Sequence, residues 1–198
     1  MFIEPHLGRN SKSEKIGWIE VISGCMFSGK TEELIRRLNR ALIARQKVEI
    51  FKPSMDKRYH DEQIISHSDR TIRSTPVDSA IDLLAMVGDC DVVGIDEAQF
   101  FDETIVSVCN TLANNGKRVI VAGLDMDYEG KPFGSMPNLL AVAEFVTKLH
   151  AICAQTGELA SFSFRLNESN TKVVLGEKDH YEARSRRTFI EGMKERKK

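Results

Sequence analysis

A glycine-bounded segment near the N-terminus has the residues and spacing of a phosphate-binding loop. It reads Gly24-Cys25-Met26-Phe27-Ser28-Gly29-Lys30-Thr31 and fits the pattern G-x-x-x-x-G-K-[ST] in full. In such a loop, backbone N–H groups and the N-terminus of the next helix surround phosphate oxygens. We expect Lys30 to neutralise the β- and γ-phosphates of ATP and Thr31 to place its hydroxyl on Mg²⁺. Cys25 is interpreted as a small loop filler, because phosphoryl transfer needs no covalent thiol.

Two carboxylates, Asp96 and Glu97, directly follow the apolar run at 92–95. Ligands of open parallel sheets bind outside the carboxyl ends of the strands, where the first strand also delivers the phosphate loop. Asp96 suits a second contact to Mg²⁺, and Glu97, on the other side of the pleat, suits a base that takes a proton from a hydroxyl or water. The pair could instead cap the helix that follows, but the upstream phosphate loop favours the chemical role. We place Asp96 and Gln99 with the loop as ATP-binding residues.

The elements around these motifs predict an α/β fold with a parallel sheet. An aromatic and β-branched strand at 18–22 leads into the loop, and Leu34, Leu38 and Leu42 form the apolar stripe of a helix that leads out of it. Further strands are apolar without alternation, which is typical of a sheet covered on both faces. The expected strands are 18–22, 48–51, 92–95 and 119–122; the expected helices are 31–45, one capped by Asp78 or Ser79, 103–115 and 137–145.

Four segments follow from this pattern. Residues 1–15 are polar and aperiodic and are expected to form a mobile leader, and 16–148 form the ATP-binding core. Residues 149–190 are expected to form a small β-rich domain, since short strand-like runs at 149–154, 160–166 and 172–175 are joined by Gly, Asn, Ser and Asp. Residues 191–198 are expected to be a charged, solvated tail.

Composition and charge exclude several classes of protein. Hydrophobic residues make up 41% and charged residues 29%, the balance of a globular protein, and 28 Lys and Arg against 29 Asp and Glu leave a net charge of −1. This balance argues against a nucleic-acid partner, which usually meets a basic surplus. No run approaches the roughly 20 apolar residues of a membrane span. Four scattered cysteines without a C-x-x-C pair fit free thiols, so we expect a cytoplasmic protein without membrane partners.

Two enzyme classes remain from the residues alone. Asp96 to Gln99 also resembles the acidic signature of helicase-type ATPases, but such enzymes need a second lobe or a ring of subunits and a basic track. A small-molecule kinase instead needs an acceptor site with apolar and aromatic groups. Phe100 and Phe101 follow the carboxylates, and Tyr128 and Phe133 lie in a Gly- and Pro-containing loop where burial in a core is less natural. The residues favour the kinase.

Several blocks of sequence together resemble the type II thymidine kinases. They are GCMFSGKTEELIRRL (24–38), FKPSMDKRY (51–59), SH (66–67), VVGIDEAQFFD (92–102), VIVAGLDMDYEGKPFG (119–134) and AEFVTKLHAIC (143–153). The resemblance implies a RecA-like core, a small domain whose lasso closes over thymidine, and transfer of the ATP γ-phosphate to the thymidine 5′-hydroxyl to give dTMP. It also implies a homotetramer and feedback inhibition by dTTP. A member that has lost activity is disfavoured by the intact Lys30, Thr31, Asp96 and Glu97.

The resemblance also assigns site residues. Glu97 looks like the base that deprotonates the 5′-hydroxyl, Lys30, Thr31 and Asp96 like phosphate and Mg²⁺ ligands, and Asp56 and Arg58 match positions near the phosphates. Tyr128 stands where many members have Phe. The positions that match the family's nucleoside site are Met26, Phe101, Leu124, Tyr128, Phe133, Ser163, Val174 and Tyr181.

The chain departs from the family at its structural zinc site. Of the four cysteine-type ligand positions only Cys153 remains, and Thr156, Ser185 and Thr188 occupy the others. Hydroxyls are poor zinc ligands beside thiolate and imidazole. A makeshift site from Cys153, His150 and His180 is conceivable, but we predict no structural zinc.

Overall fold

The computed structural model describes residues 16–55, 63–64, 72–166 and 180–196. Within these ranges the largest element is a sheet of six strands, all of whose neighbours pair in parallel. The strand that leads into the phosphate loop lies near one edge, and one strand separates it from the strand that delivers the acidic pair. In spatial order the strands are β5 Thr75–Val77, β2 Val48–Pro53, β6 Val92–Ile95, β7 Arg118–Gly123, β1 Trp18–Gly24 and β8 Phe145–Leu149.

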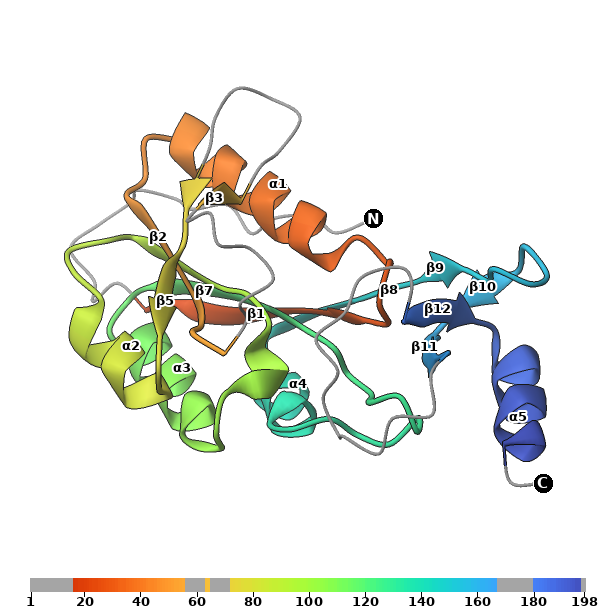
Figure 1. Ribbon diagram of the computed structural model, residues 1–198. Coiled ribbons are helices and arrows are strands. Elements are labelled where there is room, and N and C mark those ends of the chain that lie inside the picture. The colour runs from red at the N-terminus through yellow and green to blue at the C-terminus, as the bar shows by residue number, and fades with distance from the viewer. Residues whose placement is uncertain (1–15, 56–62, 65–71, 167–179, 197–198) are drawn as a thin grey trace.

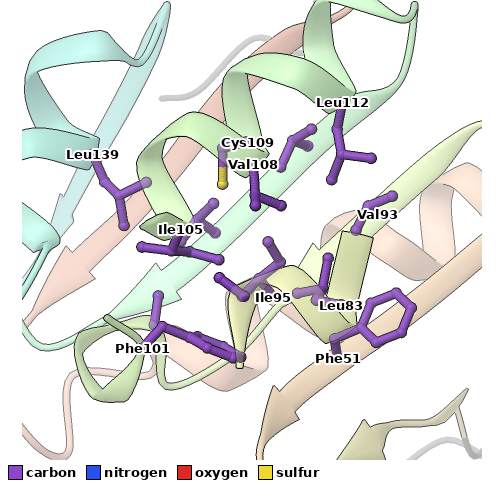
Figure 2. Packing of buried hydrophobic residues seen from close by; sticks show 14 of the residues in the cluster. Phe51, Leu83, Val93, Ile95, Phe101, Ile105, Val108, Cys109, Leu112 and Leu139 are labelled. Carbon is purple, nitrogen blue, oxygen red and sulfur yellow. The ribbon is translucent and has the colours of Figure 1, made fainter. Parts of the chain in front are cut away.

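Helices cover both faces of this sheet (Figure 1). Helix α1, Lys30–Ile43, lies on one face, where Leu34 and Leu38 pack against apolar side chains of β1, β2, β6 and β7. The other face carries the larger hydrophobic core, to which three helices contribute, as Figure 2 shows. These are α2 Ala80–Met86, α3 Thr104–Asn114 and α4 Met136–Val142.

A smaller unit lies at one side of the sheet, at the right of Figure 1. Among the residues that the structure describes, it consists of two antiparallel pairs of strands and one helix. Phe189 of the helix stacks on Phe162 of a strand at 4.6 Å between ring centroids. Its elements are β9 Ala151–Ile152, β10 Leu159–Ala160, β11 Phe162–Arg165, β12 Tyr181–Arg184 and α5 Arg186–Glu195. A further short pair, β3 Gln63–Ile64 and β4 Ile72–Arg73, lies between β2 and β5 in the chain.

Most of the predicted elements are confirmed, including the cap of α2, where the hydroxyl of Ser79 accepts from the N–H of Asp82. The helix predicted over 137–145 is wrong at its end. It stops at Val142, and Phe145 begins β8, which pairs with β1. The run is short and apolar, so periodicity alone does not separate a helix from a buried strand.

The predicted segment boundaries fall within elements of the structure. The boundary after residue 148 falls at the last residues of β8, and α5, which the sequence analysis did not predict, runs across the boundary after residue 190. The leader 1–15 and the strand expected at 172–175 lie outside the described residues. No helix in the described ranges is long and apolar enough to cross a bilayer.

Candidate active site

The phosphate loop joins β1 to α1, as its motif predicts. Gly29 has φ of 83°, a left-handed conformation that glycine adopts without a steric cost, and α1 begins at the next residue. The ammonium of Lys30 folds back over the loop and donates to the carbonyl of Cys25 at 2.8 Å. Burial lowers the pKa of Lys30, while the nearby carboxylates of Glu97 and Asp96 act in the opposite direction. The lysine therefore lies within electrostatic reach of both acids.

A direct hydrogen bond joins the phosphate loop to the acidic pair. The hydroxyl of Thr31, in the first turn of α1, donates to Oδ2 of Asp96 at 3.0 Å. Asp96 is buried at the carboxyl end of β6, and burial, followed by the charge of Glu97, raises its pKa to about 7. A cation beside this carboxylate would favour its charged form.

Glu97 is not part of the strand, contrary to the expected alternation along the pleat. Strand β6 ends at Ile95, and Glu97 has φ of 52° and ψ of 40°, a left-handed conformation uncommon outside glycine. Its N–H donates to Oδ1 of Asp96 at 2.9 Å. Glu97 occupies the N-cap position of a short 3₁₀ turn, η1 Ala98–Phe100, but its side chain makes no capping hydrogen bond. The capping interpretation therefore finds no support at Glu97.

Gln99, which the sequence analysis grouped with the ATP-binding residues, lies buried in this turn. Its side-chain amide donates to Oε2 of Glu97 at 2.5 Å and accepts from the N–H of Leu124 at 2.9 Å. It thus joins the acidic pair to the loop that follows β7.

That loop carries three of the residues expected around the nucleoside. Leu124, Tyr128 and Phe133 are half-buried, and the ring of Phe133 meets Phe100 edge-on at 5.7 Å between centroids. Phe101, also expected there, is only 5% exposed and belongs to the large core cluster of the sheet. The aromatic contact to the loop therefore comes from Phe100, which the resemblance had not singled out.

The small unit meets the phosphate loop through two expected nucleoside residues. The N–H of Met26 donates to the hydroxyl of Ser163 on β11 at 3.0 Å. Beside it, Cys25 is buried against Ala160, to whose carbonyl its thiol donates at 3.4 Å, and burial raises the pKa of that thiol. A buried thiol with a raised pKa is a poor nucleophile, in agreement with its interpretation as a loop filler.

Arg165 is a residue of the site that sequence reasoning missed. It is 1% exposed at the end of β11, and its guanidinium lies 3.7 Å from the ring centroid of Tyr128. The same group donates to the hydroxyl of Tyr181 on β12, at 3.1 Å from Nε and 2.8 Å from Nη2. It thereby joins two expected nucleoside residues that lie far apart in the sequence. Its only sequence signal is a charge at the end of an apolar strand.

The residues present fit Mg²⁺ but not zinc. The hydroxyl of Thr31 and the carboxylate of Asp96 are hard oxygen donors of the kind that Mg²⁺ prefers, and Lys30 lies within electrostatic reach of Asp96. Three of the four positions that match the family's zinc ligands also lie together: Cys153 Sγ is 3.4 Å from the hydroxyl of Thr188, and that hydroxyl is 3.3 Å from the hydroxyl of Ser185. A single thiol among neutral hydroxyls is a poor zinc donor set.

The thiol of Cys153 is instead held by hydrogen bonds. Burial acts to raise its pKa, but the hydroxyls of Thr156 and Thr188 and the backbone N–H groups of Ser185 and Gln155 outweigh it and lower the pKa to about 6. Among the described residues no three His, Cys, Asp or Glu side chains are grouped as a metal site would need. Asp56, Arg58 and Val174, named from the sequence, lie outside the described residues.

The family model and the curated relatives agree on one family. The family model described as thymidine kinase matches residues 17–189. The thymidine kinase of Rhodothermus sp. (strain ITI 518) is 60% identical over 189 residues, which cover 96% of this chain and 88% of that protein. The thymidine kinase of Bacteroides thetaiotaomicron is 54% identical over 190 residues, which cover 96% and 94%. Among solved structures, the flagellar accessory protein FlaH from Methanocaldococcus jannaschii aligns with a TM-score of 0.48 at 11% identity over 73% of this chain and 76% of that chain.

Proposed function

The chain belongs to the thymidine kinase family and phosphorylates thymidine with ATP, and we propose that Glu97 is the base of this reaction. The observation that supports the proposal is the hydrogen bond between Thr31 and Asp96. It joins the phosphate loop to the acidic pair, with Lys30 within electrostatic reach of Glu97. A triphosphate on residues 24–31 and an acceptor hydroxyl near Glu97 would then meet at the same end of the sheet.

Each residue of this group has one task in the proposed reaction. The 5′-hydroxyl oxygen of thymidine attacks the γ-phosphorus of ATP, its proton passes to Glu97, and the bond to the β-phosphate oxygen breaks to release ADP. Lys30 neutralises the β- and γ-phosphates, for which it leaves the carbonyl of Cys25. The backbone N–H groups of the loop and the start of α1 hold the remaining phosphate charge. Catalysis is then mainly alignment and neutralisation of charge.

Thr31 and Asp96 are the residues that would hold Mg²⁺. The ion, when bound with ATP, supplies positive charge to the phosphates during transfer. Since Asp96 is buried and has a raised pKa, its oxygens are a costly place for an unpaired negative charge. Without the ion, the hydroxyl of Thr31 donates a hydrogen bond to the carboxylate of Asp96.

The nucleoside is proposed to bind between the loop after β7 and the small unit. Tyr128 and Phe133 supply aromatic surface, and Ser163 and Tyr181 supply the side from β11 and β12. Through the resemblance, Val174 is assigned to the nucleoside site and Asp56 and Arg58 to positions near the phosphates, and dTTP is proposed as a feedback inhibitor. We further propose a cytoplasmic homotetramer that uses no nucleic acid and holds no structural zinc.

Steady-state kinetics of Glu97→Gln tests the base. Turnover should fall about 10²–10⁴-fold, the usual contribution of general base catalysis, with ATP binding retained. Lys30→Ala, by contrast, should also raise the KM for ATP, because its charge faces the phosphates. In an assay of a nucleoside panel with labelled ATP, thymidine should give the labelled monophosphate. Near-normal turnover in Glu97→Gln would remove this residue from the role, whereas ADP release stimulated by DNA and not by thymidine would overturn the kinase.

A further inference from the structure

Glu97 has a backbone conformation that is uncommon for a residue of its type. Its φ of 52° and ψ of 40° are left-handed, and Glu has no local hydrogen bond that favours this region as Asn or Asp does. Such residues persist where the surroundings hold them, and they concentrate at functional sites. The groups that hold Glu97 therefore decide where its carboxylate lies.

One side chain contacts that carboxylate from a fixed position. Gln99 donates through Nε2 to Oε2 of Glu97 at 2.5 Å, and its Oε1 accepts from the N–H of Leu124 at 2.9 Å. Gln99 is 3% exposed, so both ends of its amide are engaged inside the protein. An amide used in this way orients its neighbours, since reversing it would set two donors or two acceptors against each other.

The packing around Gln99 leaves it little freedom to move. A Cβ atom at Gly123 would lie 2.9 Å from Oε1 of Gln99, and one at Gly134 would lie 2.3 Å from its backbone carbonyl oxygen. The backbone thus approaches Gln99 closely at Gly123, where β7 ends, and at Gly134, where the loop 124–134 ends. The rings of Phe100 and Phe133 contact each other in the same region. The turn η1 and the loop 124–134 are consequently packed tightly against each other.

We propose that Gln99 is a positioning residue, whose amide fixes the carboxylate of Glu97 in register with the loop 124–134 that carries the nucleoside-binding side chains. The proposal rests on the proposed role of Glu97 as the base. Its consequence is that the acceptor hydroxyl and the base are aligned through one buried amide. Gln99, which the sequence places with the ATP-binding residues, then affects the rate of transfer through the position of Glu97.

Gln99→Met is the primary test, because methionine has a similar length and neither a donor nor an acceptor for these contacts. In the full-length chain, kcat for thymidine should fall about 10–100-fold, since a displacement of a catalytic group by about 1 Å has this effect. The KM for ATP should stay within about twofold of its original value. The matched control is Gln155→Met, at an exposed glutamine of the small unit that donates to Glu182 at 3.3 Å, and it should leave all constants unchanged. If Gln99→Met does not fold, Gln99→Asn keeps the amide but is too short for both contacts, and the same result is expected.

A double-mutant cycle separates positioning from a general loss of structure. Once Glu97→Ala has removed the carboxylate, adding Gln99→Met should lower kcat by less than about twofold, because residues that act as a unit are not additive. Full additivity, or a rise in the KM for ATP with kcat retained, would overturn the positioning role while leaving Glu97 as base. Normal turnover in Glu97→Ala itself would instead remove the base and this proposal together.

Discussion

The buried guanidinium of Arg165 offers a sharp test of how the small unit and the core share the nucleoside. The substitution Arg165→Met keeps an unbranched, flexible side chain in the same space but removes every hydrogen-bond donor. It therefore separates Tyr128 and Tyr181 from their common partner without opening a large cavity.

The expected magnitude follows from the hydrogen bonds and the cation–π interaction that the substitution removes. A hydrogen bond from a charged donor contributes about 1.5–3 kcal/mol, and a desolvated cation–π interaction such as the one at 3.7 Å about 2 kcal/mol. Part of this is offset, because a buried charge no longer has to be desolvated. Because these contacts also exist in the protein without nucleoside, their loss reaches the complex through displacement of Tyr128 and Tyr181. A loss of about 2 kcal/mol from that displacement would raise the KM for thymidine about 30-fold.

Initial rates with thymidine and ATP varied in turn measure this effect. The KM for thymidine should rise while the KM for ATP stays within about twofold, because Arg165 joins two residues of the proposed nucleoside site, Tyr128 and Tyr181. Arg186→Met is the control, since this exposed arginine lies 4.9 Å from the ring centroid of Phe162 in the same unit. A lower melting temperature with an unchanged KM for thymidine would show that Arg165 only stabilises the fold.

Three other expectations concern stability and metal content. The carboxylate of Glu20 is fully buried and forms salt bridges to Arg37 at 2.8 Å and Arg118 at 2.6 Å. Glu20→Leu leaves both buried arginines without this partner and should lower the free energy of unfolding, measured in urea, by about 3–5 kcal/mol. A loss under about 1 kcal/mol would contradict this expectation. A hydrogen bond from Arg36 lowers the pKa of Glu33 from its ordinary value of 4.5 to about 2. The stabilisation by this carboxylate is therefore complete above about pH 5 and is lost as the pH falls toward about 2. The stability difference between the chain and Glu33→Gln should narrow over that range, and a constant difference would refute the assignment. Metal analysis should find far less than one zinc per chain and EDTA should leave the melting temperature unchanged; about one zinc per chain would overturn the prediction.

Local sequence was sufficient for the elements that carry their own signals. The strand, loop and helix around residues 24–31 are confirmed because apolar run, glycine pattern and four-residue leucine spacing all lie within one continuous segment. The cap at Ser79 and the end of α3 before Gly116, which has φ of 79°, are equally local.

Elements that depend on distant partners were harder to predict. Phe145 begins strand β8 because this segment pairs in parallel with β1, which lies more than a hundred residues earlier in the chain. Helix α5 has only a short apolar stripe among charges, and Phe189 gains its burial from Phe162 on β11. Periodicity carries no information about such partners, so tertiary contacts decided both elements.

For the site, the sequence alone determined the residue types, the phosphate loop, the acidic pair and, through several matching blocks, the family. Only the tertiary structure decided that Glu97 leaves the strand in a left-handed conformation, that Gln99 contacts it, and that Arg165 joins Tyr128 to Tyr181. The physical reason is that motifs record which groups the chemistry needs, whereas orientation comes from close packing and from hydrogen bonds such as those that tie Gln99 to Leu124 and Arg165 to Tyr181. Those contacts exist only once the sheet has brought its carboxyl ends together.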